Sequence, residues 1–169
     1  MSLSMYQASI PVFTRMLGNL SAILDKAVAF AEVKKIEPDV LLNARLAPDM
    51  FPLARQVQIA TDSVKGCAAR LAGMDIPSFP DTESSFAELQ ERLKKTQAFL
   101  SSCSAAQIDG SEAKSIVLNF PGQELKFSGQ DYLLNFVLPN FYFHLTTAYA
   151  ILRHNGLELG KMDFLGRLA

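Results

Sequence analysis

The chain has two histidines, His144 and His154, and these are the side chains best suited to acid–base or metal chemistry. His144 immediately precedes Leu145 on the apolar stripe of a predicted helix, so its imidazole can reach the interior of a helical bundle. His154 follows ten residues later, which is about 15 Å along a helix, so the two rings cannot share one metal ion. We therefore expect His144 to act alone, as a buried or pocket-lining histidine that is hydrogen-bonded to a neighbour.

Gln56 is the polar side chain that we expect to face His144. It flanks an apolar stripe on a second predicted helix, formed by Leu53, Val57 and Ala60, so its neutral amide can point into the interior of the bundle. Aromatic residues near His144 complete a candidate pocket, lined by Gln56, Phe141, Tyr142, His144 and Tyr149. His144 is the candidate catalytic residue within it, either as a base or as a metal ligand.

Hydrophobic residues at steps of three and four predict four long helices that would position these side chains. The helices span about residues 3–35, 52–73, 84–104 and 129–155. Residues 115–128 alternate apolar and polar side chains across a Pro-Gly turn, which predicts a β-hairpin, and residues 37–50 form a connector with room for one short helical turn. Because each narrow apolar stripe needs partners, the sequence predicts a single all-α domain over residues 1–169, a four-helix bundle with a small β-hairpin before its last helix.

Caps and prolines refine these boundaries. Either Thr82 or Ser84 can cap the third helix, and Ser128 can cap the last one. Pro11 should kink the first helix or mark its true beginning, because proline lacks the N–H of a helical backbone bond. For the same reason Pro139 predicts a bend in the middle of the last helix.

The last helix is apolar on two sides. Its inward stripe is expected to consist of Leu134, Leu138, Phe141, Leu145, Ala148 and Leu152. Phe136 and Phe143 fall on roughly the opposite side, which predicts the interface of a homodimer. Burial by the hairpin and the C-terminal tail, or a ligand or lipid surface, are the alternatives. In that tail, Lys161 and Asp163 either belong to a docked segment or close over the mouth of the pocket.

The charges of the chain indicate a nearly neutral protein with solvated helix faces. Sixteen basic and seventeen acidic residues give a formal net charge of -1, so the composition does not favour nucleic acid or an anionic membrane as a partner. On the second helix, Arg55 and Asp62 occupy the outermost positions with Gln58 and Lys65 close by, which predicts a face exposed to solvent.

The cysteines and the N-terminal residues indicate a reducing compartment. Cys67 and Cys103 fall singly on apolar helical stripes, so a structural disulfide is not expected. The first residues lack the charged and apolar regions of a signal peptide, and no segment approaches the roughly 18 apolar residues that span a bilayer. The cytoplasm is therefore the expected location, with no membrane partner.

Two segments resemble a family of uncharacterised proteins related to the DinB and YfiT-like four-helix bundles. They are PLARQVQIATDSVKG on the second helix and LPNFYFHLTTAYAILRHNGLELGKMDFLG at the C-terminus. The resemblance covers nearly the whole chain and implies an up-down-down-up bundle, in which residues 75–81 could belong to a long crossover between the second and third helices. It also implies dimers, because relatives commonly dimerise. Many relatives bind a divalent metal through three histidines, one on the second helix and two in an H-x-x-x-H pair on the last, and some transfer thiols or isomerise thiol adducts.

This chain keeps one of those three histidine positions. His144 matches the first histidine of the pair, Ala148 replaces the second, and Gln56 stands where the helix-two histidine is expected. The resemblance therefore implies a degenerate metal site, and a divalent metal is not favoured as a cofactor. Three hypotheses follow: a bundle that binds a small molecule or a partner, a thiol transferase-like or hydrolase-like enzyme that uses His144, and a structural dimer.

Overall fold

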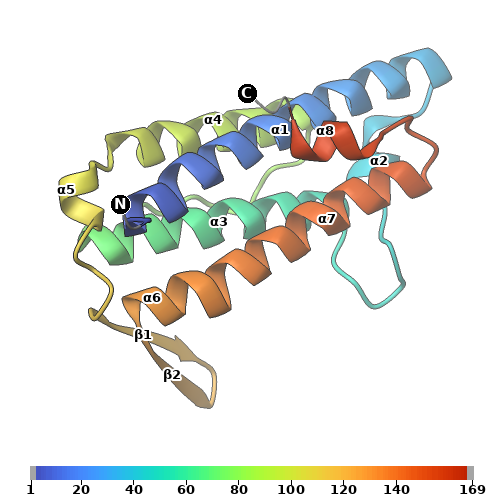
Figure 1. Cartoon of the computed structure of the whole chain (residues 1–169). Helices are drawn as coiled ribbons and strands as arrows, with labels where there is room; N and C mark the ends of the chain where they lie inside the picture. The colour runs from blue at the N-terminus through green and yellow to red at the C-terminus, as the bar shows by residue number, and fades with distance from the viewer. Residues whose placement is uncertain (1–2, 167–169) are drawn as a thin grey trace.

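Four long helices pack lengthwise in the computed structural model, which describes residues 3–166 (Figure 1). They are α1 (Met5–Lys34), α3 (Leu53–Ala72), α4 (Phe86–Ser102) and α7 (Leu138–His154). Helix α3 lies against α7, α4 and α1, and α1 also contacts α4. The four helices run up, down, down and up, so the chain must cross the full length of the bundle between α3 and α4 (Figure 1). This architecture confirms the predicted all-α bundle.

Shorter elements connect and extend these helices. They are α2 (Pro38–Leu42), α5 (Ala105–Ile108), β1 (Ser115–Phe120), β2 (Gln123–Ser128), α6 (Gly129–Asp131), the π-helix η1 (Tyr132–Val137) and α8 (Lys161–Leu165). Strands β1 and β2 pair antiparallel, as predicted, around a turn in which Gly122 has a φ of 78°. The left-handed backbone of that turn suits glycine because it has no Cβ. The hairpin lies at the end of the bundle where α6 begins (Figure 1).

Helix α1 begins before Pro11, so the prediction that this proline could mark the start of the helix is wrong. Ser4 caps the helix: its hydroxyl accepts from the Gln7 amide, and the Gln7 side chain accepts from the Ser4 amide. This capping box satisfies two backbone donors that a helix end leaves unpaired. Helix α4 is also capped later than predicted, by Ser85, which is one residue after Ser84 and three after Thr82.

The segment before Pro139 is a π-helix, where a continuous bent α-helix was expected. The Leu138 amide donates to the carbonyl of Leu133, five residues back, and Pro139 has no amide to continue an α-helical ladder. The wider turn shifts which residues face inward. Leu133 is fully buried, whereas Leu134, which was predicted to face the core, is 43% exposed. The predicted inward stripe therefore holds only beyond Pro139.

The core is formed by the apolar faces of the four long helices. The rings of Phe13 on α1 and Phe141 on α7 meet edge to face, with their centroids 5.5 Å apart. Cys67 and Cys103 are buried as free thiols. Over residues 3–166, no helix is both long enough and apolar enough to cross a membrane.

Candidate functional site

His144 and Gln56 are in direct contact, as the sequence predicted. The His144 ring nitrogen Nδ1 lies 2.7 Å from Gln56 Oε1, joining α7 to the first turns of α3. Gln56 in turn donates from Nε2 to the carbonyl of Phe51, at 2.9 Å. Both side chains are buried, His144 with 8% and Gln56 with 1% of its surface exposed. The prediction of a buried, hydrogen-bonded His144 is confirmed.

The contact to Phe51 fixes the tautomer of His144. A carbonyl only accepts hydrogen bonds, so the NH₂ end of Gln56 must face Phe51 and its oxygen must face the histidine. His144 Nδ1 therefore carries the proton and donates it to Gln56. In the neutral ring the other nitrogen, Nε2, is left as an unprotonated acceptor. Within residues 3–166 Nε2 has no hydrogen-bond partner, and it is not sealed from solvent.

The surroundings of His144 favour this neutral ring. Burial lowers the pKa of His144 below its ordinary value, and the positive charge of Arg55 on α3 lowers it further. Both effects act against the imidazolium form, because a charged ring loses hydration and is repelled by the guanidinium. At neutral pH the Nε2 lone pair is therefore available to accept a proton or a hydrogen bond.

The three aromatic residues of the candidate pocket do not gather around His144. Phe141 is fully buried in the core, against Phe13 and Tyr142. Tyr149 lies further along α7, where its hydroxyl donates to the carbonyl of Leu159 at 3.3 Å. Of the five predicted pocket residues, the structure brings Gln56 and His144 together and places the aromatic rings in the core and under the C-terminal segment.

The residues present do not fit the three-histidine metal site of the superfamily. Gln56 Oε1 is already occupied by the His144 Nδ1–H, and Ala148 is fully buried with no donor atom. Among the residues that the structure describes, no group of three or more His, Cys, Asp or Glu side chains could hold a metal ion. One imidazole nitrogen is left, and a single ligand does not hold zinc or a similar ion firmly.

Phe136 and Phe143, the predicted interface residues, have different environments. Phe136 is partly buried, with its ring centroid 5.5 Å from that of Phe127 on the hairpin and 6.0 Å from that of Tyr132. Phe143 is 55% exposed, and its ring meets His144 edge to face at 5.3 Å. The hairpin thus covers the first ring, and the second remains at the surface beside the histidine.

The C-terminal segment is docked along α1. Asp163 forms an ion pair with Lys26 at 2.6 Å and also accepts from the amide of Gly160. Asn19 donates to the carbonyl of Phe164 at 2.9 Å. These contacts hold Asp163 against α1, where it caps α8.

The polar face of α3 is covered at Gln58 and Lys65, which corrects the prediction that these two residues are exposed to solvent. The side chains of Arg55 and Asp62 are each 38% exposed. The crossover between α3 and α4 lies over it: Gln58 donates to Glu83 at 2.9 Å, and the Lys65 ammonium lies 4.1 Å from the ring centroid of Phe79. Only 5% of Gln58 and 4% of Lys65 is exposed. Phe79 and Glu83 supply the aromatic ring and the carboxylate of this cover, and Phe79 belongs to residues 75–81, for which the resemblance implied a long crossover.

Arg92 on α4 is the centre of this covered region, and no local pattern in the sequence distinguishes it from the other charged residues of that helix. Its side chain is 1% exposed and binds three carboxylates, Asp62 at 2.8 Å, Asp81 at 2.9 Å and Glu83 at 2.9 Å. Its Nε donates to Thr61 Oγ1 at 2.7 Å. Burial is tolerated here because every nitrogen of the guanidinium has an acceptor.

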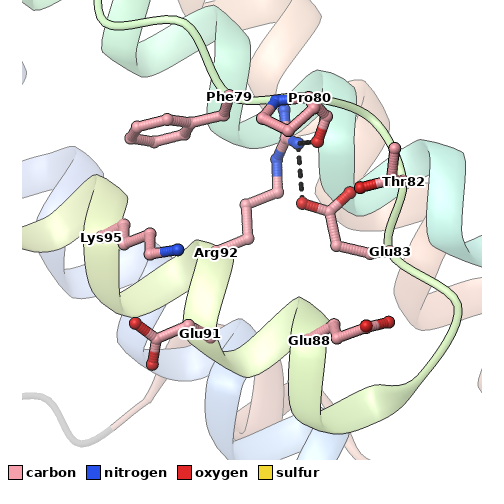
Figure 2. A pocket seen from close by; sticks show the side chains of 8 residues that line it. All are labelled: Phe79, Pro80, Thr82, Glu83, Glu88, Glu91, Arg92 and Lys95. Carbon is pink, nitrogen blue, oxygen red and sulfur yellow. Dashed lines mark hydrogen bonds and ion pairs between the residues drawn. The ribbon is translucent and has the colours of Figure 1, made fainter.

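A cavity of about 190 Å³ lies beside Arg92, between the crossover and α4. Figure 2 shows Arg92 bonded to Glu83 at one side, with Phe79 above and Glu91 and Lys95 on the α4 side. The cavity is smaller than the roughly 300 Å³ at which ligand pockets usually begin. Because the Arg92 charge is already met by its own carboxylates, we assign this cluster a structural role.

Comparisons with known proteins agree with this fold. The family model described as a domain of unknown function, DUF1993, matches residues 5–165. The chain is also similar to a solved structure, the crystal structure of a DinB family member protein from Shewanella denitrificans. The two are 46% identical, the match covers 96% of this chain and 92% of that one, and the TM-score is 0.87. The search of curated proteins found no match.

Proposed function

We propose, from the premise that this chain belongs to the DUF1993 family, that it is a DinB-like bundle which binds a small molecule through His144 without a metal. The observation that carries the proposal is the bond from His144 Nδ1 to Gln56, which leaves Nε2 as a neutral acceptor. Gln56 occupies the place of a metal ligand in the resemblance, and here it orients the histidine. The ligand expected at Nε2 is one that donates a hydrogen bond.

The neighbours of His144 indicate the rest of that ligand. The exposed ring of Phe143 stands edge to face against the imidazole, 5.3 Å between centroids. Phe51, whose carbonyl holds Gln56, is also exposed, with Arg55 6.0 Å from its ring centroid. An exposed aromatic ring beside one polar acceptor suits a flat or apolar molecule that carries an O–H or N–H group.

Phenol is a probe that tests this chemistry, since it has one donor on an aromatic body. We expect phenol to change the ¹⁵N chemical shift of His144 Nε2 in the full chain, because the hydroxyl donates to that nitrogen. His144→Gln should abolish the effect, and His154→Gln, which alters the exposed histidine of the same helix, should leave it intact. A His144 Nε2 signal that stays unchanged at millimolar phenol would contradict the proposal.

An enzyme that uses His144 as a general base is the second candidate. The same neutral Nε2 favours it, because a base needs an unprotonated nitrogen within reach of its substrate. Elemental analysis of the purified protein separates this from a metal-dependent enzyme. Zinc or nickel at one ion per chain would support the metal enzyme and would overturn the metal-free proposal.

A homodimer is the third proposal, and it rests on Phe143 alone. Phe136 has a partner in the hairpin ring Phe127, so it no longer requires a second chain to cover it. Phe143 is 55% exposed, and burying such a side chain against a partner contributes about 1.5 to 3 kcal/mol. A twofold pair of α7 helices would bring the two copies of this residue together.

A further inference from the structure

A groove of about 610 Å³ runs between α3, η1, the start of α7 and strand β1. We call it the α3–η1 groove and define it by Ser63, Arg70, Phe120, Tyr132, Phe136 and Asn140. Its volume falls within the range of small-molecule sites, about 300 to 1,000 Å³. Neither His144 nor Gln56 lines it, and it meets the Arg92 network only at Asp62 and Arg55, which also line the groove.

Arg70 places a positive charge in this groove, and among the described residues it forms no ion pair with a carboxylate. Its Nη1 instead donates to the Tyr132 hydroxyl at 3.0 Å. Burial raises the pKa of Tyr132 to about 12, so this partner stays neutral. The carboxylate of Asp62, also on the groove, is bound to Lys65 and Arg92.

Gly66 leaves space for the Arg70 guanidinium, because it has no side chain. A Cβ placed at Gly66, one turn earlier on α3, would lie 2.5 Å from Arg70 Nη1 and near no other side chain. Glycine in the middle of a helix is less favourable than alanine, because it loses more backbone freedom on folding. At this position it lets the guanidinium lie close along the helix, aimed at Tyr132.

The wall opposite α3 is apolar because of the π-helical turn. A π-helix places residues five apart on the same side, so Tyr132 and Val137 both line the groove, and Phe136 joins them. Asn140 adds a polar group further along. Its Nδ2 donates to Ser63 Oγ at 2.7 Å, which leaves its oxygen without a partner among the described residues.

We propose that the α3–η1 groove binds an organic anion with a single carboxylate and an unbranched apolar body, the charge pairing with Arg70 and the body lying along Phe136 towards Asn140. Arg55 also lines the groove but is paired with Asp81, which leaves Arg70 as the arginine available to a ligand. One such arginine matches one carboxylate, which it can bind through two parallel N–H groups. From Arg70 to Ser63 the groove follows seven residues of α3, about 10 Å. That length suits a medium-chain carboxylate.

Octanoate is the probe for this site, titrated into the full chain by calorimetry. We expect it to bind, and we expect Arg70→Met to weaken it by roughly tenfold or more, since a hydrogen bond to a charged group commonly contributes such a factor. Arg153→Met, which removes an exposed arginine at the far end of α7, is the matched control and should leave the affinity unchanged. Octan-1-ol, with the same chain and no charge, should bind more weakly than octanoate.

Gly66→Ala tests the geometry while the charge remains. The new Cβ displaces the guanidinium, so octanoate should again bind more weakly, and alanine favours the helix, so the variant should fold. If Arg70→Met does not fold, this variant and NMR contacts between octanoate and Phe136 in the unaltered chain decide the question. Three results would overturn the proposal: no binding of octanoate, octan-1-ol binding as tightly as octanoate, or an octanoate affinity that neither Arg70→Met nor Gly66→Ala changes.

The proposal for the α3–η1 groove and the proposal for the His144 site can be tested independently. His144→Gln should leave octanoate binding unchanged, and Arg70→Met should leave the phenol effect on His144 unchanged. A loss of octanoate binding in His144→Gln would mean that the two regions form one site, and the separate groove proposed above would be wrong.

Discussion

Arg92 of α4 donates from Nη2 to Asp62 Oδ1 of α3 across 2.8 Å, although its side chain is 1% exposed and that of Asp62 is 38% exposed. The arginine is thus the buried member of a pair whose acid reaches water. The same guanidinium binds Glu83 and the carbonyl of Pro80, so it fastens the crossover to both helices. Its charge therefore ties the crossover, which contributes no residue to the buried apolar core, to the two core helices α3 and α4.

Arg92→Met should therefore destabilise the fold strongly. Removing one partner of a buried ion pair costs about 3 to 5 kcal/mol, and the partial exposure of Asp62 and Asp81 places the expected loss near about 3 kcal/mol. Urea denaturation measures it as a lower unfolding midpoint. Lys95→Met, three residues along and exposed, is the control and should change the midpoint little. Equal effects of the two substitutions would show that the buried network adds nothing specific.

His144 should make the fold less stable in mild acid. Its pKa is lowered in the folded chain by burial and then by Arg55, so below about pH 6.5 the unfolded chain takes up a proton that the folded chain refuses. The stability that neutral His144 contributes is fully present above the pKa that this residue has in the unfolded chain. It is lost as the pH falls through the lower pKa of His144 in the folded chain. Urea titrations at several pH values measure this loss, which His144→Gln should remove. A His144 signal that titrates above its ordinary value by NMR would contradict the argument.

Installing the missing histidines should create zinc affinity. In Gln56→His with Ala148→His, three imidazoles would occupy the positions that the superfamily uses, and zinc should bind and raise the melting temperature. Because Ala148 is fully buried, the added ring should first lower stability by about 1 to 3 kcal/mol. Elemental analysis and melting with and without zinc test both effects. A folded double variant that gains no metal would show that these positions do not converge.

Phe143→Glu tests the proposed dimer. A carboxylate in the contact would be buried without a partner, so a wild-type dimer should become a monomer at micromolar concentration in sedimentation velocity. The control is Thr146→Glu, which adds the same charge at another exposed position on α7. A wild-type chain that already sediments as a monomer would end the dimer proposal.

Removal of the residues after Gly160 should lower the melting temperature. Phe164 packs against Tyr149, with 6.1 Å between ring centroids, and Asn19 and Lys26 lose their partners in the tail. Differential scanning calorimetry measures the shift. Unchanged melting with altered phenol binding would instead support a lid over the His144 site.

Hydrophobic periodicity was enough to predict the four helices and the contact between His144 and Gln56. Both residues flank apolar stripes, and a stripe fixes the direction in which its neighbours point. Gly73 and Ser128 likewise marked helix ends correctly, because a left-handed C-cap and a hydroxyl N-cap are local features.

The errors arise where distant segments decide the outcome. Lys65 is polar and lies opposite the apolar stripe of α3, so nothing local shows that Phe79 will cover it. Leu134 has the spacing of a core residue, but the extra residue of the π-helical turn moves it out. The position of Phe141 has a related cause, since its ring packs against Phe13 on α1, a residue far away in the sequence.

The π-helical turn also links the number of residues in segment 132–137 to the presence of Pro139. A π turn accommodates one residue more than an α-helix between the same two ends, so deleting a residue from 132–137 would restore an α-helix without rotating either flank. That shorter helix would bring the ring of Pro139 against a carbonyl, which the wide turn now avoids. Relatives that lack this proline are therefore expected to carry a one-residue gap in the same segment, and the two differences should be inherited together.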